Sequence, residues 1–336
     1  MKRGFHLILH HRFYMSQNTP KYSVIIPVYN RAQELSELLG SLATQTFKKF
    51  EVIVVDDGSS VRADVVVDKF REQLDISYYY KPNTGQGKSR NYGFEKAKGD
   101  YLVIFDSDCE IPPHYFDAVE QALHENKLDV WGGPDMAAQH YTLLQKSISY
   151  CMTSVLTTGG IRGGKQAANN FQPRSFNMGM RKEAFQKSGG FHLNRLSEDI
   201  ELSIRLKKMG YKIGLIEDAF VYHKRRTSLL AYFQQVYRFG KGRASLIHMH
   251  RDAIRPAHLF PTFFVFTFFL SFLLASPLAE LIRATYLLYF FIILFDASIK
   301  NASIGVGVLS VVSALIQHTG YGIGFIIGLF SSPEKT

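Results

Sequence analysis

The fold class is decided by residues 21–60, which read KYSVIIPVYNRAQELSELLGSLATQTFKKFEVIVVDDGSS. The run Tyr22–Val28 is almost wholly apolar, which is typical of a strand buried on both faces. Leucines recur with helical spacing in Ala32–Ala43, and Phe50–Val55 is a second apolar run. This order predicts two parallel strands joined by a helix through a right-handed crossover.

The alternation of strands and helices continues as far as Trp131. We predict a helix over Arg62–Leu74, a strand over Ile76–Tyr80, a helix over Gln86–Ala97, and strands over Tyr101–Phe105 and Asp129–Gly132. Strands that alternate with helices indicate an α/β fold with a Rossmann-like, mostly parallel sheet.

Polar residues follow three of the predicted strands: Asn30, Asp56–Asp57 and Asp106–Asp108. Because the carboxyl ends of parallel strands share one edge of the sheet, and ligands bind there, we expect these groups on one rim. Taken alone, each cluster is also explained by a turn, because Asn, Asp, Ser and Gly are common turn residues. Together, two carboxylates at i and i+2, such as Asp106 and Asp108, indicate a site for a hard divalent cation. Such a cation would offset the charge that develops on a diphosphate leaving group.

Residues 83–91, NTGQGKSRN, form a glycine-rich segment at the start of a predicted helix. Its backbone amides, together with Lys88 and Arg90, suit phosphate or uracil carbonyl oxygens. The segment lacks the Walker spacing, and no GxGxxG follows the first strand. These absences argue against an NTPase and a dinucleotide-dependent dehydrogenase. A sugar-phosphate nucleotidyltransferase would also need a glycine-rich loop directly after the first strand.

The net charge and the cysteine content restrict the kinds of partner and the compartment that we expect for the protein. The chain has 336 residues and a formal net charge of +10, which favours phosphate-bearing or anionic-lipid partners. We expect no nucleic-acid partner. Two cysteines, Cys109 and Cys151, exclude a disulfide framework and a cysteine-based zinc site, and they fit a reducing compartment.

The C-terminal quarter of the sequence is apolar. Residues Leu259–Ala279 carry no charge, and this run has the length of about 20 residues that crosses a bilayer. Leu281–Ile299 is a second candidate span. Ser303–Phe330 is a third, in which Gln317, His318 and Gly320 leave a kink or re-entrant turn open. Ordinary buried helices are the alternative, but the phenylalanine-rich first run is apolar all round, which favours membrane spans.

Eight Lys and Arg residues but only one acidic residue lie between Lys224 and Arg255, directly before the first apolar run. Positive charge beside a span marks the cytoplasmic side, so we predict a cytoplasmic N-terminal part on an integral protein of the cell inner membrane. The same residues would bind anionic membrane lipids. We therefore divide the chain into a disordered extension (1–20), an α/β domain (21–223), basic interface helices (224–257) and a transmembrane region of two to three helices (258–332).

Several motifs, in order, resemble the family-2 glycosyltransferases of the GT-A fold. They are Val24–Asn30, Asp56–Ser59, Gly85–Gly93, Gly99–Asp108, Phe176–Arg181, Gly189–Phe191 and Ser197–Leu202 with Arg205-Leu206. The similarity covers residues 21–243. Each motif is weak alone, but the ordered set is specific. A further segment, Gln235–Phe239, resembles the Gln-x-x-Arg-Trp signature of processive members, with Phe239 in place of tryptophan.

The resemblance implies roles for individual residues. Pro27, Tyr29, Asp56, Asp57, Arg90 and Asp106 would bind the nucleotide sugar, with Asp57 at the uracil edge. Asp106 and Asp108 would hold Mn or Mg, and His223 would either complete this metal site or be a surface histidine that flanks a helix. Asp199 would be the catalytic base, with Glu198 as the alternative; both residues would also cap a helix predicted over Ile200–Met209. Asn177, Gln235 and Arg238 would contact the acceptor. Trp131 would either stack on an acceptor sugar or pack in the core.

The implied activity is an inverting, metal-dependent transfer of a sugar from a UDP-sugar to a hydroxyl of a saccharide or lipid-linked acceptor. The reaction would take place at the cytoplasmic membrane face and serve cell envelope polysaccharide biosynthesis. A processive polysaccharide synthase is the alternative, which Phe239 and the few spans disfavour. A non-catalytic membrane scaffold with this fold would require a broken carboxylate set, whereas every expected carboxylate is present.

Overall fold

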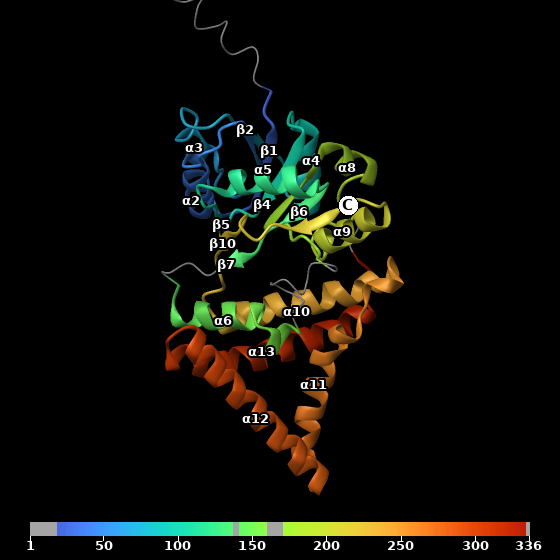
Figure 1. Cartoon of the computed structure of the whole chain (residues 1–336). Helices are drawn as coiled ribbons and strands as arrows, with labels where there is room; N and C mark the ends of the chain where they lie inside the picture. Colours follow the sequence, from blue (N-terminus) through green and yellow to red (C-terminus); the bar gives the residue numbers. More distant parts are fainter. Residues whose placement is uncertain (1–18, 137–140, 160–170, 334–336) are drawn as a thin grey trace, which may run out of the picture.

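The computed structural model describes residues 19–136, 141–159 and 171–333. It has an α/β domain above a layer of long C-terminal helices (Figure 1). The extension predicted over residues 1–20 lies almost entirely outside the described residues.

The described residues of the α/β domain form a seven-stranded sheet of order β3-β2-β1-β4-β8-β6-β9. The strands are β1 (Tyr22–Val28), β2 (Phe50–Asp56), β3 (Ile76–Tyr80), β4 (Tyr101–Phe105), β6 (Val130–Gly132), β8 (Asn177–Arg181) and β9 (Ile213–Leu215). The first four are parallel to one another, as predicted. Strand β8 lies between β4 and β6 and runs antiparallel to both. The strand predicted near Trp131 is therefore present as β6, but it pairs with β8 and not directly with β4.

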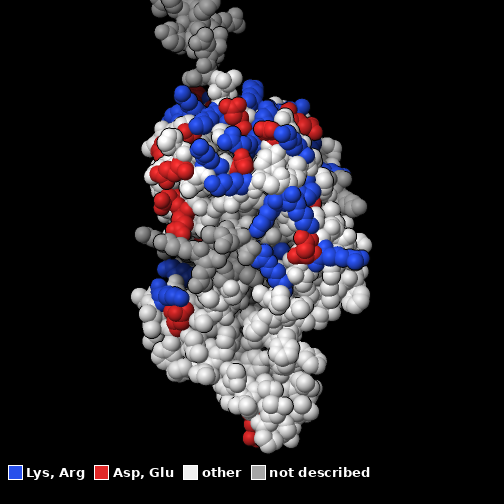
Figure 2. All heavy atoms as spheres, turned by 45° about the vertical axis from the view of Figure 1, so that its right-hand side comes forward, with Lys and Arg blue, Asp and Glu red and all other residues white. Residues whose placement is uncertain are grey.

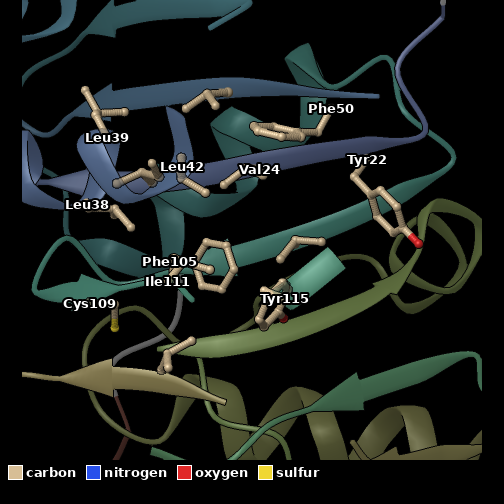
Figure 3. Close-up of a cluster of buried hydrophobic side chains, with 14 of the residues drawn as sticks. Tyr22, Val24, Leu38, Leu39, Leu42, Phe50, Phe105, Cys109, Ile111 and Tyr115 are labelled. Atoms are coloured by element: carbon tan, nitrogen blue, oxygen red, sulfur yellow. The ribbon is translucent and has the colours of Figure 1, made fainter. Parts of the chain in front are cut away.

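Helices cover both faces of this sheet. On one face, α2 (Ala32–Ala43), α3 (Asp64–Asp68) and α5 (Tyr115–Asn126) bury their apolar side chains. On the other face lie α4 (Gln86–Lys96), α8 (Lys182–Ser188) and α9 (Glu198–Lys208). Figure 3 shows Leu38, Leu39 and Leu42 of α2 packed over the strands, as their helical spacing predicts.

One sequence interpretation is corrected in this domain, and one open alternative is resolved. The helix predicted over Arg62–Leu74 is only the short α3, because its β-branched Val65-Val66-Val67 run has low helix propensity and only Val67 is fully buried. Trp131 is fully buried between Tyr22 and Tyr101, so it packs in the core and has no exposed face for a sugar.

A second, three-stranded sheet carries residues of the rim. It consists of β5 (Cys109–Glu110), β10 (Val221–His223) and β7 (Asp135–Met136) in the order β5-β10-β7. Strand β10 pairs antiparallel with β5, and this register places His223 opposite Cys109. The end of β10 therefore lies next to Asp108, which is 115 positions earlier in the chain.

The helical layer contains α6 (Leu143–Thr153), α7 (Val155–Thr158), α10 (Leu229–Ser245), α11 (Pro256–Leu273), α12 (Pro277–Lys300) and α13 (Ile304–Leu329). The last three are long and apolar enough to cross a membrane. Helix α13 is one continuous α-helix through Gln317–Gly320, so the re-entrant turn considered there is not formed. On the face drawn in Figure 2, charged side chains cover the α/β domain, whereas the helices below it show few, at one edge of the layer and at the lower tip.

Helix α13 differs from the two helices before it. Helices α11 and α12 extend away from the α/β domain, whereas α13 lies directly beneath α10 (Figure 1). The two helices approach through glycines: a Cβ added to Gly324 would lie 2.0 Å from the Tyr237 carbonyl oxygen, and one on Gly328 would lie 2.3 Å from that of Lys241. These matched four-residue steps show that α13 and α10 run parallel, with glycines allowing their backbones to touch.

Candidate functional site

A cavity of about 1070 Å³ lies between the α/β domain and the helical layer. Most of the predicted site residues line it: Pro27, Tyr29, Asp57, Arg90, Asp106, Asp108, Glu198, Asp199, His223, Gln235 and Arg238. Helices α10, α11 and α13 also contribute to its wall. The structure thus brings together the rim of the sheet, the start of α9 and the membrane-side helices.

Two predicted site residues, Asp56 and Asn177, are buried and do not line this cavity. The buried Asp56 carboxylate accepts hydrogen bonds from the Ser59 and Ala63 amides, at 2.9 and 3.1 Å, and from the Tyr78 hydroxyl. It therefore shapes the loop after β2 and does not face a nucleotide. The buried Asn177 side chain donates to the Ala219 carbonyl oxygen and accepts from the Tyr115 hydroxyl, so it cross-links the core and does not face an acceptor.

Asp57 ties the strand end to the glycine-rich segment. Its carboxylate accepts hydrogen bonds from the Thr84 amide at 2.9 Å and the Gly85 amide at 2.8 Å, and it pairs with Lys81. Gly85 has a φ of 96°, a conformation that glycine adopts without strain. Asp57 therefore fixes the segment that opens α4 while one side of the residue lines the cavity.

The divalent-cation prediction falls on a cluster formed by Asp108, Cys109 and His223, whose ligand atoms lie within 4.8 Å of one another. His223 Nε2 is 3.2 Å from Asp108 Oδ1, and Arg31 pairs with the other oxygen of Asp108. Burial raises the pKa of the Asp108 carboxyl, but His223 and Arg31 outweigh burial and hold it well below its usual range. Asp108 is therefore an anion in this site.

The donor set fits a divalent cation. Among the described residues, the buried Asp108 Oδ1 faces His223 Nε2 at 3.2 Å without forming a hydrogen bond of good geometry. Asp106, two residues earlier, lines the same cavity but is not part of the cluster of Asp108, Cys109 and His223. Burial raises the pKa of the Cys109 thiol well above its usual value, and its Sγ faces the Phe176 carbonyl oxygen at 3.5 Å. A protonated thiol is a poor ligand, so the carboxylates and the imidazole are the residues that would hold the ion.

Arg90 joins this cluster to α9. Its side chain is 1% exposed, and it donates to Asp106 Oδ1 at 2.8 Å and to Glu198 Oε1 at 2.6 Å. Arg90 thus bridges two carboxylates and also lines the cavity, and its contact with a nucleotide stays a prediction. Burial raises the pKa of the Glu198 carboxyl, and Arg90 opposes this rise.

Asp199 is the more available of the two acidic residues at the start of α9. One oxygen accepts a hydrogen bond from the Ser175 amide at 3.2 Å, and the other accepts from the amide of Ile200 at 2.8 Å. The helix begins at Glu198, earlier than predicted, after Ser197 in a left-handed conformation with φ of 59°. Both acids therefore lie in the first turn, where the helix dipole favours negative charge.

Sequence reasoning missed several arginines of the cavity: Arg31, Arg174, Arg225, Arg226 and Arg243. Arg225 and Arg226 follow His223 by only two and three positions, and this proximity was the available signal. The basic stretch that contains Arg225 and Arg226 is predicted to face the membrane surface, whereas the structure places both side chains at the cavity. Burial lowers the pKa of the Arg226 guanidinium, and repulsion from Arg31 and Arg238 adds to this effect, against attraction by Asp108.

The model of glycosyl transferase family 2 matches residues 23–189, about half of the chain. The chain belongs to glycosyl transferase family 2. It is 38% identical over 117 residues to an uncharacterized glycosyltransferase of Rickettsia typhi, covering 34% of this chain and 36% of that one. It is 28% identical over 274 residues to the probable glycosyltransferase YdaM of Bacillus subtilis, covering 75% and 63%.

A third family-2 relative is the poly(ribitol-phosphate) β-N-acetylglucosaminyltransferase TarS of Staphylococcus aureus, which is 38% identical over 114 residues, 33% of this chain and 20% of TarS. The chain thus spans less than two thirds of the length of these relatives. The mannosyltransferase PcManGT from Pyrobaculum calidifontis, solved with GDP-Man and Mn²⁺, superposes with a TM-score of 0.60 at 17% identity, covering 91% and 93%. This similarity confirms the predicted fold.

Proposed function

We propose that the protein is an inverting, metal-dependent glycosyltransferase that moves a sugar from a nucleotide sugar, predicted to be a UDP-sugar, to a hydroxyl of a saccharide or lipid-linked acceptor. The observation that carries this proposal is the convergence of Asp106, Asp108 and His223 with Asp199 on one cavity. The GDP-Man and Mn²⁺ bound to PcManGT support a nucleotide-sugar donor and a divalent cation.

In the proposed mechanism, Asp106, Asp108 and His223 would hold a Mn or Mg ion, which supplies positive charge to the diphosphate leaving group. The acceptor hydroxyl oxygen attacks the anomeric carbon on the face opposite the diphosphate. A new carbon–oxygen bond forms as the bond to the diphosphate oxygen breaks, so the configuration inverts. Asp199 accepts the hydroxyl proton. Arg31, beside Asp108, adds positive charge at the same place.

The proposal is tested by following nucleoside-diphosphate release by the full chain from a panel of UDP- and GDP-sugars. We expect release from one donor in the presence of Mn or Mg, its loss with a chelator and its return with added metal. No metal-dependent release from any donor would contradict the proposal. Product length separates single addition, which we favour, from a processive synthase, which would make long chains.

We also propose that the protein is integral to the membrane, with its catalytic domain at the cytoplasmic face and membrane lipids as partners. Basic residues of α10 and the apolar surfaces of α11 and α12 support this placement. In this arrangement the α11–α12 hairpin crosses the bilayer, whereas α13 lies along the interface. Two observations support the placement of α13. It packs parallel to α10, and 44% of its most apolar 18-residue segment is buried, against 17% for α11 and 11% for α12.

This arrangement predicts that Ser331, after α13, lies on the same side of the membrane as the catalytic domain. We expect a membrane-impermeant maleimide to label Ser331→Cys and the exposed control Lys69→Cys from the same side of oriented vesicles. It should label Ser276→Cys, between α11 and α12, from the other side. Native Cys109 and Cys151 are buried and give little background. Labelling of Ser331→Cys together with Ser276→Cys would instead indicate three spans.

A further inference from the structure

The cavity changes in chemical character along its walls. Where it meets the α/β domain, its lining is charged and polar, with carboxylates such as Asp106 and Asp199 among arginines. Where it meets the helical layer, its lining includes Phe260 of α11 and Tyr321 of α13, besides other apolar residues. Both helices are long and apolar enough for a membrane. A cavity with a polar and an apolar part matches a ligand that also has a polar and an apolar part. Apolar groups bind favourably against the apolar wall, whereas a polar group buried there without a hydrogen bond costs free energy.

The junction between the two parts contains a buried guanidinium with spare donors. The Arg225 side chain is 2% exposed and lines the cavity, and its Nη1 binds Asp135 Oδ2 at 2.7 Å. Its Nε and Nη2 find no hydrogen-bond partner among the described residues. Buried donors of a charged group are costly when unpaired, so this pattern indicates a site for an anion.

The surroundings of Arg225 place this site at the contact of the two layers. The neighbouring Arg226 lines the same cavity. Tyr232 of α10 lies near Arg225, and its hydroxyl donates to Gln317 Oε1 of α13 at 2.6 Å. Tyr232, near Arg225, therefore joins α10 to α13 where the arginines line the cavity. A phosphate here would have its oxygens at the guanidinium forks and a chain attached to it would continue toward α11 and α13.

We propose that the acceptor is a phosphate-linked lipid whose phosphate binds Arg225 and Arg226, whose sugar hydroxyl reaches Asp199 and whose hydrocarbon chain lies against α11 and α13. The proposal rests on the glycosyl transfer proposed above and specifies its acceptor. The bonds made and broken are those of that reaction, so the phosphate of the acceptor stays intact. A free polysaccharide acceptor would leave the apolar part of the cavity without a function.

The test measures binding of defined probes to the full chain in detergent by calorimetry. Geranylgeranyl diphosphate represents the acceptor, geranylgeraniol lacks its phosphates, and pyrophosphate lacks its chain. UDP with Mn reports the donor half separately. We expect geranylgeranyl diphosphate to bind at least about tenfold more tightly than either fragment, since a hydrogen bond to a charged group contributes about this factor or more.

Two substitutions connect this binding to the arginines. Arg226→Gln and the conservative Arg225→Lys, which keeps a charge for Asp135, should each weaken geranylgeranyl diphosphate binding about tenfold or more and leave UDP binding within about twofold. Retained UDP binding also shows that the variants fold. Arg251→Gln, an exposed residue outside the cavity, is the matched control and should change neither affinity.

Three results would overturn the inference. The diphosphate lipid could bind no better than the alcohol or pyrophosphate. The substitutions could leave its binding unchanged. They could also weaken UDP as much as the lipid, which would assign the arginines to the donor. Failure of the wild-type chain to bind UDP with Mn is a different result, because it would count against the proposed function itself.

Discussion

The variant Asp108→Asn is expected to lose metal binding and glycosyl transfer together. Asparagine keeps the shape of the side chain but removes the negative charge that faces His223 and Arg31. Without this charge the remaining groups hold a divalent cation weakly, and the leaving diphosphate loses its counter-charge. We expect transfer to fall by about 10²–10³-fold at a fixed Mn concentration, the size of effect seen when a transition-state charge loses one stabilising group.

The measurement is the rate of nucleoside-diphosphate release over a range of Mn concentrations, together with direct Mn binding. Asp68→Asn is the matched control, because it makes the same chemical change at an exposed carboxylate that pairs only with Arg71 on the surface. It should behave as wild type. Mn-dependent transfer by Asp108→Asn within about threefold of the control would remove Asp108 from the proposed metal site.

The variant Asp199→Asn is expected to bind donor and metal normally and to transfer about 10²–10⁴-fold more slowly, the usual contribution of a positioned general base. An asparagine oxygen still accepts a hydrogen bond from the Ser175 or the Ile200 amide, so the start of α9 is preserved. The side chain loses its ability to take the hydroxyl proton, together with one of its two amide hydrogen bonds and its negative charge 3.9 Å from Arg174 Nη1. Transfer rates and UDP affinity, measured on the same preparation, separate these effects.

Glu198→Gln is the informative comparison for this variant. Glu198 is buried and accepts hydrogen bonds from Arg90 and Gln86, so its neutralisation removes one partner of a buried guanidinium. We expect a lower free energy of unfolding, because a buried charge that loses its partner is strongly destabilising. If Glu198→Gln is the variant that folds normally and loses transfer, while Asp199→Asn remains active, the two assignments must be exchanged.

Much of the α/β domain was predictable because its signals are local. The apolar run Tyr22–Val28 predicts a buried strand, and the spacing of the leucines in α2 predicts a helix with one buried face. Both elements are observed. The carboxylates at strand ends were predicted to share a rim for the same reason, since parallel pairing brings all strand ends to one edge. The short α3 was not predicted, because its length depends on which of three valines contacts the core.

The roles of individual polar residues depend on contacts between distant segments. Asp56 and Asp57 are adjacent and chemically identical, yet Asp56 closes its own loop while Asp57 holds the glycine-rich segment. Asn177 belongs to a recognisable motif, but Tyr115 and Ala219 use its side chain in the core. No pattern in the sequence separates such neighbours, because the difference lies in which groups pack against them.

The sequence alone determined the parallel βαβ architecture, the acidic rim, the family and the presence of three membrane-length apolar runs. Each of these follows from patterns of residues that are close together in the chain. Only the tertiary structure decided that His223 faces Asp108 and that Arg90 bridges Asp106 and Glu198. It also decided that α13 lies against α10. The physical reason is that strand pairing, charge pairing and glycine-mediated backbone contact join residues that are far apart in the chain.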